Sequence, residues 1–176
     1  MNNLAASLGL IRTISDYPKP GVEFRDITPL LADGSAFVHV VDALNAHVTN
    51  ESVVAGVEAR GFIFASAMAA RKGIGFVPIR KAGKLPYETF SRQYGLEYGS
   101  DVIEVHTDAF INHKKVVLVD DVLATGGTLS AALDLIEEAG GEASKIIVLL
   151  EISSLGGRER ILAKHPHISI ETLVTS

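Results

Sequence analysis

The stretch "KKVVLVDDVLATGGTLSAAL", residues 114–133, decides the fold class of this chain. An apolar run at 116–119 leads directly into two adjacent carboxylates, Asp120 and Asp121. A loop of small residues follows, and beyond it the apolar residues of 129–136 recur at helical spacing. The pattern predicts a buried strand, a tight turn and a helix, with two acidic side chains at the carboxyl end of the strand.

Other parts of the chain repeat this alternation of strand and helix. The strand candidates are short, rich in β-branched residues and not cleanly alternating, which is typical of strands covered on both faces of a parallel sheet. We therefore expect an α/β fold, an open and mainly parallel twisted sheet flanked by helices. The strands are expected at 52–58, 75–80, 116–121 and 145–153, and the helices at 37–48, at 61–73 with a stop at Gly73, and at 129–136 with a stop at Gly140-Gly141.

The composition limits the classes of protein to which the chain can belong. Its 176 residues fit one domain, and 47% hydrophobic with 21% charged residues is the balance of an ordinary globular protein. A net charge of −5 argues against a broad nucleic-acid face, and the absence of cysteine excludes disulfides and thiolate metal sites. No signal peptide or long apolar span is apparent. We expect a cytoplasmic protein with neither nucleic-acid nor membrane partners.

The small loop Thr125-Gly126-Gly127-Thr128 has the makings of a monophosphate site. Glycines before a helix let successive amides turn towards one point, and the helix start adds unpaired N–H groups with a partial positive charge. The loop matches neither a Walker motif nor a dinucleotide fingerprint. The alternative is a plain strand-to-helix turn in which Thr128 caps the helix.

The two aspartates before this loop favour a ligand. Adjacent carboxylates beside a bound phosphate would repel it unless a polyol or a cation lay between them. Ribose hydroxyls can donate to carboxylates, and Mg²⁺ takes one or two carboxylates together with ligand oxygens. The combination predicts a site for a ribose 5-phosphate at the end of the strand.

The segment "VVLVDDVLATGGT" (116–128) resembles the signature of the type I phosphoribosyltransferases, which use 5-phosphoribosyl 1-pyrophosphate (PRPP). The resemblance implies that Asp120 and Asp121 contact the ribose hydroxyls, and that Ala124 and residues 125–128 hold the 5-phosphate. It also implies Mg²⁺ as cofactor. The metal would be bound through PRPP, with water-mediated contact to the aspartates as an option.

Residues 56–65, "GVEARGFIFA", resemble the pyrophosphate loop of the same family. The resemblance assigns Ala59 and Arg60 to PRPP, with Arg60 also among the catalytic residues, and it implies a cis peptide at Glu58-Ala59. A guanidinium suits paired phosphate oxygens. The alternative for Arg60 is an exposed arginine at a helix start.

Three further segments, 17–31, 77–89 and 94–105, resemble the members of this family that act on adenine. We expect a single domain, 1–176, with a small N-terminal hood over about residues 1–35. Residues 80–101 have weak helical or strand pattern, and because a loop of that length is uncommon in a compact domain, we expect a flexible lid loop over about 80–101. The resemblance places Arg80, Lys81 and Lys84 around the pyrophosphate, partly from a neighbouring subunit, makes Glu97 the acid or base near the purine, and assigns Phe24 and Arg25 to the base.

The activity implied by the resemblance is transfer of the 5-phosphoribosyl group from PRPP to adenine, giving AMP and pyrophosphate, by a homodimer. Another purine as acceptor, or a PRPP-binding regulator without turnover, are the alternatives. Glu97 could instead be a solvated loop carboxylate. Glu23 departs from the family, where an apolar residue is frequent, and its direction bears on base specificity. The six histidines have no metal-ligand spacing and are expected at the surface or in packing.

Overall fold

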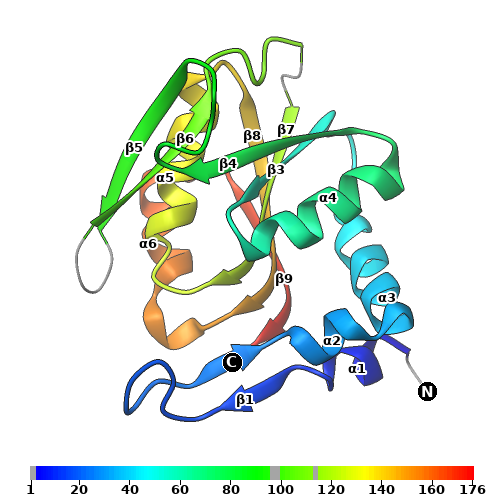
Figure 1. The fold of residues 1–176 in the computed structure, drawn as a ribbon. Helices are drawn as coiled ribbons and strands as arrows, with labels where there is room; N and C mark the ends of the chain where they lie inside the picture. The colour runs from blue at the N-terminus through cyan, green and yellow to red at the C-terminus, as the bar shows by residue number, and fades with distance from the viewer. Residues whose placement is uncertain (1–2, 96–99, 113–114) are drawn as a thin grey trace. The chain divides into compact units, whose positions relative to one another are not determined.

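The computed structural model describes residues 3–95, 100–112 and 115–176 (Figure 1). The chain forms two compact units, Met1–Ala46 and His47–Ser176. The single domain with a hood over about residues 1–35 stays a prediction. Among the described residues, no helix has the length and apolar character needed to cross a membrane.

The first unit combines three helices with a two-stranded ribbon. Helix α1 (Asn3–Leu8) lies against α3 (Gly34–Asn45), and the Ser7 hydroxyl hydrogen-bonds to His39 Nδ1 at 3.1 Å. Helix α3 begins after Asp33, whose carboxylate accepts a hydrogen bond from the amide of Ala36 and so satisfies one of the unpaired N–H groups. The expected helix at 37–48 is therefore present but shifted towards the N-terminus. The remaining elements are β1 (Arg12–Ile14), antiparallel to β2 (Phe24–Asp26), and α2 (Thr28–Ala32).

The second unit is built on a seven-stranded sheet in the order β5-β6-β4-β3-β7-β8-β9. Five neighbouring strands, β4, β3, β7, β8 and β9, are parallel to one another. Strands β5 and β6 form an antiparallel hairpin at the β4 edge. This confirms the predicted open, mainly parallel sheet. The strands are β3 (Val53–Val57), β4 (Gly75–Lys81), β5 (Thr89–Gly95), β6 (Ser100–His106), β7 (Lys115–Leu123), β8 (Glu142–Glu151) and β9 (Ser169–Thr175).

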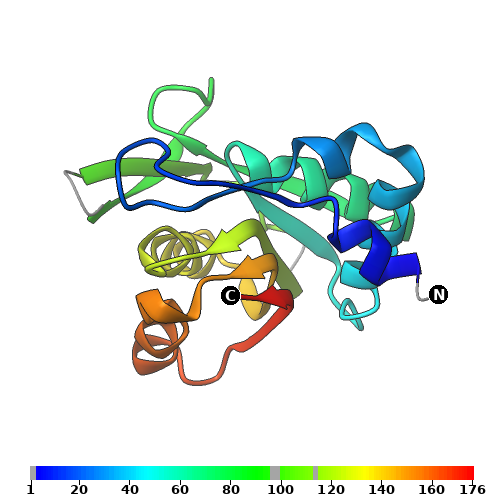
Figure 2. The same cartoon turned by 90° about the horizontal axis from the view of Figure 1, so that it is seen from below.

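Helices cover both faces of this sheet. Helix α4 (Arg60–Lys72) packs on one face, while α5 (Gly127–Glu138) and α6 (Gly157–Lys164) lie on the other (Figure 2). Helix α4 ends at Gly73, which has a left-handed φ of 69°, so the predicted stop is confirmed. A short 3₁₀ turn, η1 (Ser153–Leu155), connects β8 to α6.

The chain crosses over in opposite directions from the two central strands. From β3 it passes through α4 to β4 on one side, and from β7 it passes through α5 to β8 on the other. Strands β3 and β7 are parallel neighbours, with Gly56 paired to Val119, so their carboxyl ends meet at the same edge. This is a topological switch point, where open α/β sheets bind their ligands.

The segment expected as a lid loop over about 80–101 is largely β-structure, which corrects that part of the prediction. Strand β5 begins at Thr89, and among the described residues of the segment only 82–88 lie outside strands. The sequence pattern that indicates a strand here is the two-residue period of β6, where Ile103 and Val105 are buried in the core. Nearby glycines and charged residues obscured that alternation. Whether the hairpin acts as a lid stays a prediction.

Candidate active site

The predicted phosphate loop, residues Ala124–Thr128, joins β7 to α5. Helix α5 begins at Gly127, and Gly126 occupies the capping position with a left-handed φ of 77° and no side-chain cap. Thr128 is thus inside the first turn of the helix, and the alternative in which it caps the helix is wrong. A pocket opens beside the loop, lined by Asp120, Val122 and residues 124–129.

Both glycines of the loop are approached closely by other backbone. A Cβ atom on Gly126 would lie 2.7 Å from the carbonyl oxygen of Gly157, and one on Gly127 would lie 3.1 Å from that of Gly95. Gly126 also needs its left-handed conformation, which disfavours other residues. The loop is consequently held between α6 on one side and the β5–β6 hairpin on the other.

The two aspartates at the end of β7 lie under the start of α4. Asp121 is buried, and its Oδ2 is 2.8 Å from an Arg60 guanidinium nitrogen. The backbone amide of Asp121 donates to Asp120 Oδ1 at 2.8 Å. A Cβ atom on Gly61 would lie 2.8 Å from the same Oδ1, so only glycine lets α4 come this close to Asp120.

Burial controls the protonation of this pair. Desolvation raises the pKa of Asp120 well above its usual value, and the neighbouring Asp121 charge adds to the effect. Desolvation also raises the pKa of Asp121, although Arg60 opposes the shift. Negative charge at Asp120 is therefore unfavourable unless a hydroxyl donor or a cation approaches it.

The predicted pyrophosphate loop follows β3. The Glu58-Ala59 peptide is cis, as the resemblance to the family implied, and Arg60 is the first residue of α4. The Arg60 side chain is only 36% exposed and is directed to Asp121, so it is not simply an exposed arginine at a helix start. The structure brings this arginine and the two aspartates together at the switch point.

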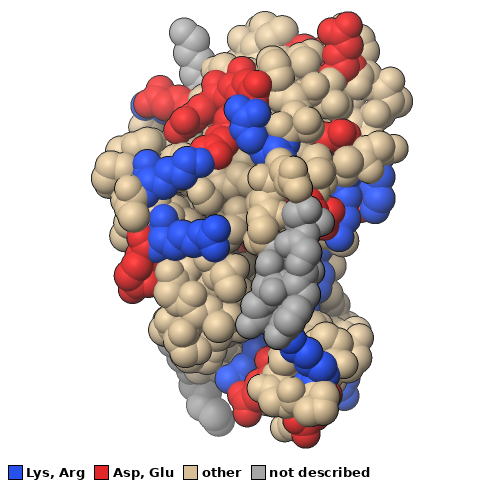
Figure 3. All heavy atoms as spheres, turned by 90° about the vertical axis from the view of Figure 1, so that its left-hand side faces the viewer, with Lys and Arg blue, Asp and Glu red and all other residues tan. Residues whose placement is uncertain are grey.

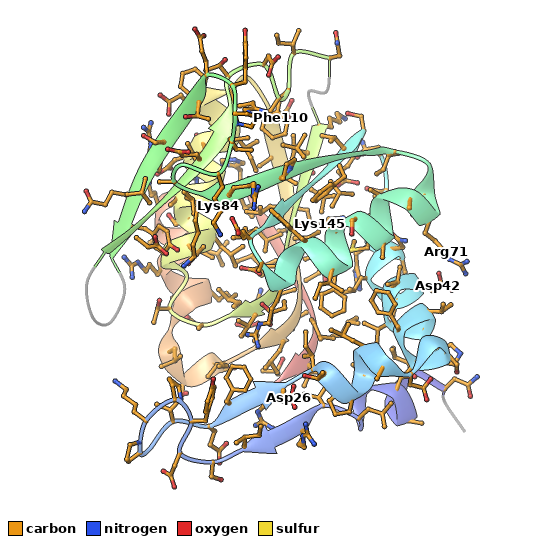
Figure 4. All side chains as sticks on the ribbon, viewed as in Figure 1. Asp26, Asp42, Arg71, Lys84, Phe110 and Lys145 are labelled. Carbon is orange, nitrogen blue, oxygen red and sulfur yellow. The ribbon has the colours of Figure 1, made fainter. Side chains whose placement is uncertain are left out.

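Glu58 is a site residue that the sequence analysis missed. Its side chain is 9% exposed and binds Lys84 Nζ at 2.5 Å and Arg80 Nε at 3.4 Å, while the amide of Lys81 donates to it at 2.9 Å. Figure 4 labels Lys84 in the loop after β4. The available signal was the position of Glu58, directly after a buried strand.

The hydrogen bonds around Glu58 change its acidity. Desolvation alone would raise its pKa, but the bonds from Lys84, Lys81 and Arg80 together lower it to about 2. Glu58 thus stays ionised and holds two of the cations predicted to bind pyrophosphate. The third, Lys81, pairs through Nζ with Asp101 of β6 at 2.8 Å.

Charges of both signs lie next to each other elsewhere in the second unit as well. On the face that Figure 3 shows, basic side chains are interspersed with acidic ones. An ion pair joins β5 to α5, where Arg92 lies 2.7 Å from Glu138, and Lys164 of α6 pairs with Asp134. Such a surface differs from the one-signed basic face typical of nucleic-acid binding.

The residues predicted to bind the base belong to the first unit. The Phe24 ring makes an edge contact with Tyr17 at 5.1 Å between centroids, and Arg25 donates to the Thr13 hydroxyl at 2.7 Å. Glu23 has a 66% exposed side chain, 3.8 Å from Arg25, so it is directed to solvent. Asp26, labelled in Figure 4, follows Arg25 on β2.

Glu97, the predicted acid or base, lies outside the described residues. The predicted metal is Mg²⁺, bound through PRPP. Within the described part of the chain, no three histidine or acidic side chains group in a way that could hold a metal ion. The neighbouring carboxylates of Asp120 and Asp121 suit water-mediated contact with a Mg²⁺ ion that is bound through a phosphorylated ligand.

Comparison with known proteins identifies the family. Residues 31–169 match the model of the phosphoribosyl transferase domain. Over 163 residues the chain is 50% identical to the adenine phosphoribosyltransferase of Roseiflexus sp. (strain RS-1), covering 92% of this chain and 94% of that protein.

Solved structures agree with the sequence relatives. The adenine phosphoribosyltransferase of Thermoanaerobacter pseudethanolicus superposes with a TM-score of 0.91 at 44% identity, covering 98% of this chain and 99% of that one. The Giardia lamblia enzyme, complexed with 9-deazaadenine, gives 0.91 at 38% identity, with coverages of 98% and 97%. The chain therefore belongs to the type I phosphoribosyltransferase family, among the adenine phosphoribosyltransferases.

Proposed function

We infer that this protein is an enzyme that transfers the 5-phosphoribosyl group of PRPP to adenine, giving AMP and pyrophosphate in purine salvage. One observation carries the inference: at the switch point, the Arg60–Asp121 pair lies beside a glycine loop that opens helix α5. The adenine phosphoribosyltransferase of Roseiflexus sp., to which the chain is 50% identical, supports the same conclusion.

The phosphate loop binds the 5-phosphate of PRPP. The amides of Gly126 and Gly127 and the hydroxyls of Thr125 and Thr128 supply the hydrogen bonds. The small side chain of Ala124 leaves room for the phosphate beside the loop. The N-terminal charge of α5 adds about 0.3–2 kcal/mol. Most of the binding therefore comes from the amides and hydroxyls.

Asp120 and Asp121 bind the ribose. Its hydroxyls donate to the carboxylates, which offsets the desolvation that raises the pKa of both groups in the free protein. Their negative charge also lies near the anomeric carbon. As the bond from C1 to the pyrophosphate oxygen breaks, positive charge develops on the sugar, and nearby carboxylates stabilise it.

The leaving pyrophosphate is bound by Ala59, Arg60, Arg80, Lys81 and Lys84. Each of these four cations already faces a carboxylate of the protein, so it is held in a definite position before substrate arrives. Pyrophosphate oxygens then replace or share those partners. A Mg²⁺ ion bound through PRPP would supply further neutralisation of the leaving group.

Adenine is bound by Phe24, which stacks on the ring, and by the backbone around Arg25, which reads its edge. A 6-oxo purine presents the opposite donor and acceptor pattern and leaves those groups unpaired, so the site discriminates strongly against it.

Glu97 exchanges a proton with the purine while N9 forms its bond to C1. The β5–β6 hairpin and the preceding loop keep water away from the sugar cation.

We further propose that the protein is a homodimer in the cytoplasm, with some of the cations crossing the interface. Sedimentation velocity at micromolar concentration measures the dimerisation directly. A single species with the mass of one chain would contradict the dimer but not the activity.

A purine panel tests the function. Purified protein is incubated with PRPP, Mg²⁺ and, separately, adenine, hypoxanthine, guanine and xanthine, and nucleotide formation is followed by absorbance. AMP formed from adenine alone is the expected result. Turnover of a 6-oxo purine would contradict the base assignment, and PRPP binding without turnover on any base would make the chain a regulator.

A further inference from the structure

The turn before helix α6 packs directly against the phosphate loop. Gly157, the first residue of α6, is buried, and a Cβ atom added to it would lie 2.1 Å from the carbonyl oxygen of Ala124 and 2.9 Å from the amide nitrogen of Gly126. Both of these atoms are backbone and cannot rotate away. The two segments therefore pack so closely that a Cβ atom at residue 157 does not fit unless one of them moves.

Strong contacts fix this turn to the sheet. The Arg158 guanidinium binds both carboxylate oxygens of Glu151 at the end of β8, at 2.9 and 2.5 Å, and also donates to the carbonyl of Ile170 on β9 at 3.0 Å. Glu151 is buried, and such a bidentate pair fixes direction as well as distance. The amide of Ile152 donates to the carbonyl of Leu123, the residue just before the phosphate loop, at 2.9 Å.

We propose that Gly157 is a positioning residue for binding of the 5-phosphate. Arg158 holds the first turn of α6 on the sheet, and the bare backbone of Gly157 supports the phosphate loop from behind, so that its amides point at one place. Gly157 touches no substrate; it acts through Ala124 and Gly126. The inference rests on the proposed function, because it assigns the phosphate of the nucleotide to that loop.

The matched variants are Gly157→Ala and Gly156→Asn. The first adds one methyl group that must displace Ala124. The second adds a larger side chain one residue away, where the nearest atom to a Cβ is Glu159 Oε2 at 3.9 Å, and asparagine tolerates the left-handed φ of 65° at Gly156. The two substitutions perturb the same turn, but only one of them reaches the phosphate loop.

Calorimetric titration with AMP and with adenosine isolates the 5-phosphate. The ratio of the adenosine Kd to the AMP Kd measures what the phosphate contributes. Because ångström-scale misplacement of binding groups can cost up to about a hundredfold, we expect Gly157→Ala to lower this ratio by about tenfold. The adenosine Kd itself and the ratio for Gly156→Asn are expected to match the wild type. A purely structural role would instead change both ligands equally.

A wild-type ratio in folded Gly157→Ala would overturn the proposal, and so would a wild type that binds AMP no more tightly than adenosine. Should Gly157→Ala fail to fold, Arg158→Lys decides the matter. It keeps the charge but loses the bidentate geometry, and a smaller drop in the ratio is expected; an unchanged ratio contradicts the proposal. Absence of turnover in a wild type that binds AMP would remove the proposed function alone.

Discussion

At the scale of single residues, the site is organised by carboxylates that hold cations before any substrate is present. Glu58 binds Lys84 and Arg80, and Asp121 binds Arg60. Each long, flexible cation is thereby restricted to one region, which would lower the entropy lost on binding of the proposed pyrophosphate. The sequence could identify the cations from their resemblance to the family. Its position directly after a buried strand marked Glu58 as a candidate, but its pairing with these cations depends on the three-dimensional approach of β4 and its following loop to the end of β3.

Glu58→Gln tests the acid dependence of this arrangement. The pKa of Glu58 is lowered from 4.5 to about 2, so its stabilising effect is complete above pH 4.5 and is lost as the pH falls from there to about 2. We expect Glu58→Gln to lower the free energy of unfolding by about 1–2 kcal/mol at neutral pH and to flatten the loss of stability in acid. Urea unfolding at a series of pH values measures both. Equal acid sensitivity in the two proteins would contradict this role.

Asp120→Asn tests a pH dependence of stability that is opposite in sign to that of Glu58. Because the folded state raises the pKa of Asp120, the stability linked to its protonated form is present in acid and is lost as the pH rises through the folded pKa. The variant is expected to unfold at a higher temperature than the ligand-free wild type at pH 8, with little difference at pH 4, while losing PRPP turnover. Calorimetric melts at the two pH values decide the point; a destabilised variant at pH 8 would contradict it.

Glu97→Gln tests the proposed proton transfer. General acid–base steps contribute roughly 10²–10⁴-fold, and kcat is expected to fall within that range while the KM for PRPP changes little. Steady-state kinetics with adenine give both constants. Nearly full turnover in the variant would show that the carboxylate does not move the proton.

At the scale of secondary structure, the sequence predicted the buried central elements well and the edges poorly. Strands β3, β7 and β8 are largely buried and apolar on both faces, and residues 75–79 of β4 are apolar, so their continuous apolar runs are visible in the sequence. The hairpin strand β5 has alternately exposed residues and many polar side chains. Its pairing with β6 depends on contacts between segments, which local patterns do not encode. For the same reason β1, β2 and β9 were not predicted.

The end of helix α4 provides a prediction at this scale. Gly73 has φ 69°, and a Cβ atom there would meet nothing within 4 Å, so any cost of substitution comes from the backbone conformation alone. Gly73→Ala is expected to destabilise the protein by about 1 kcal/mol, and Gly73→Asn by less, since asparagine tolerates this conformation. Urea unfolding of the three proteins is the measurement. Equal losses for both variants would point to a steric cause.

At the scale of the whole molecule, the site lies where the crossover connections of the sheet change direction, between β3 and β7. The phosphate loop and the pyrophosphate loop are far apart in the sequence, yet both lie at the carboxyl ends of neighbouring strands, β7 and β3. The alternation of strands and helices was enough to predict such an edge. The order of the strands, and therefore which two loops become neighbours, required the structure. The proposed origin of base specificity also lay beyond residue patterns, since in that proposal it depends on backbone directions near Phe24.

We propose that the carboxylates at the end of β7 act on PRPP, and the rate of AMP formation by Asp121→Asn tests this most directly. Asp134→Asn is the matched control, because Asp134 lies on α5 and pairs with Lys164. We expect Asp121→Asn to lower kcat/KM for PRPP at least about a hundredfold, in line with the loss of one preorganised electrostatic group, and Asp134→Asn to match the wild type. Wild-type turnover by a folded Asp121→Asn would contradict the account.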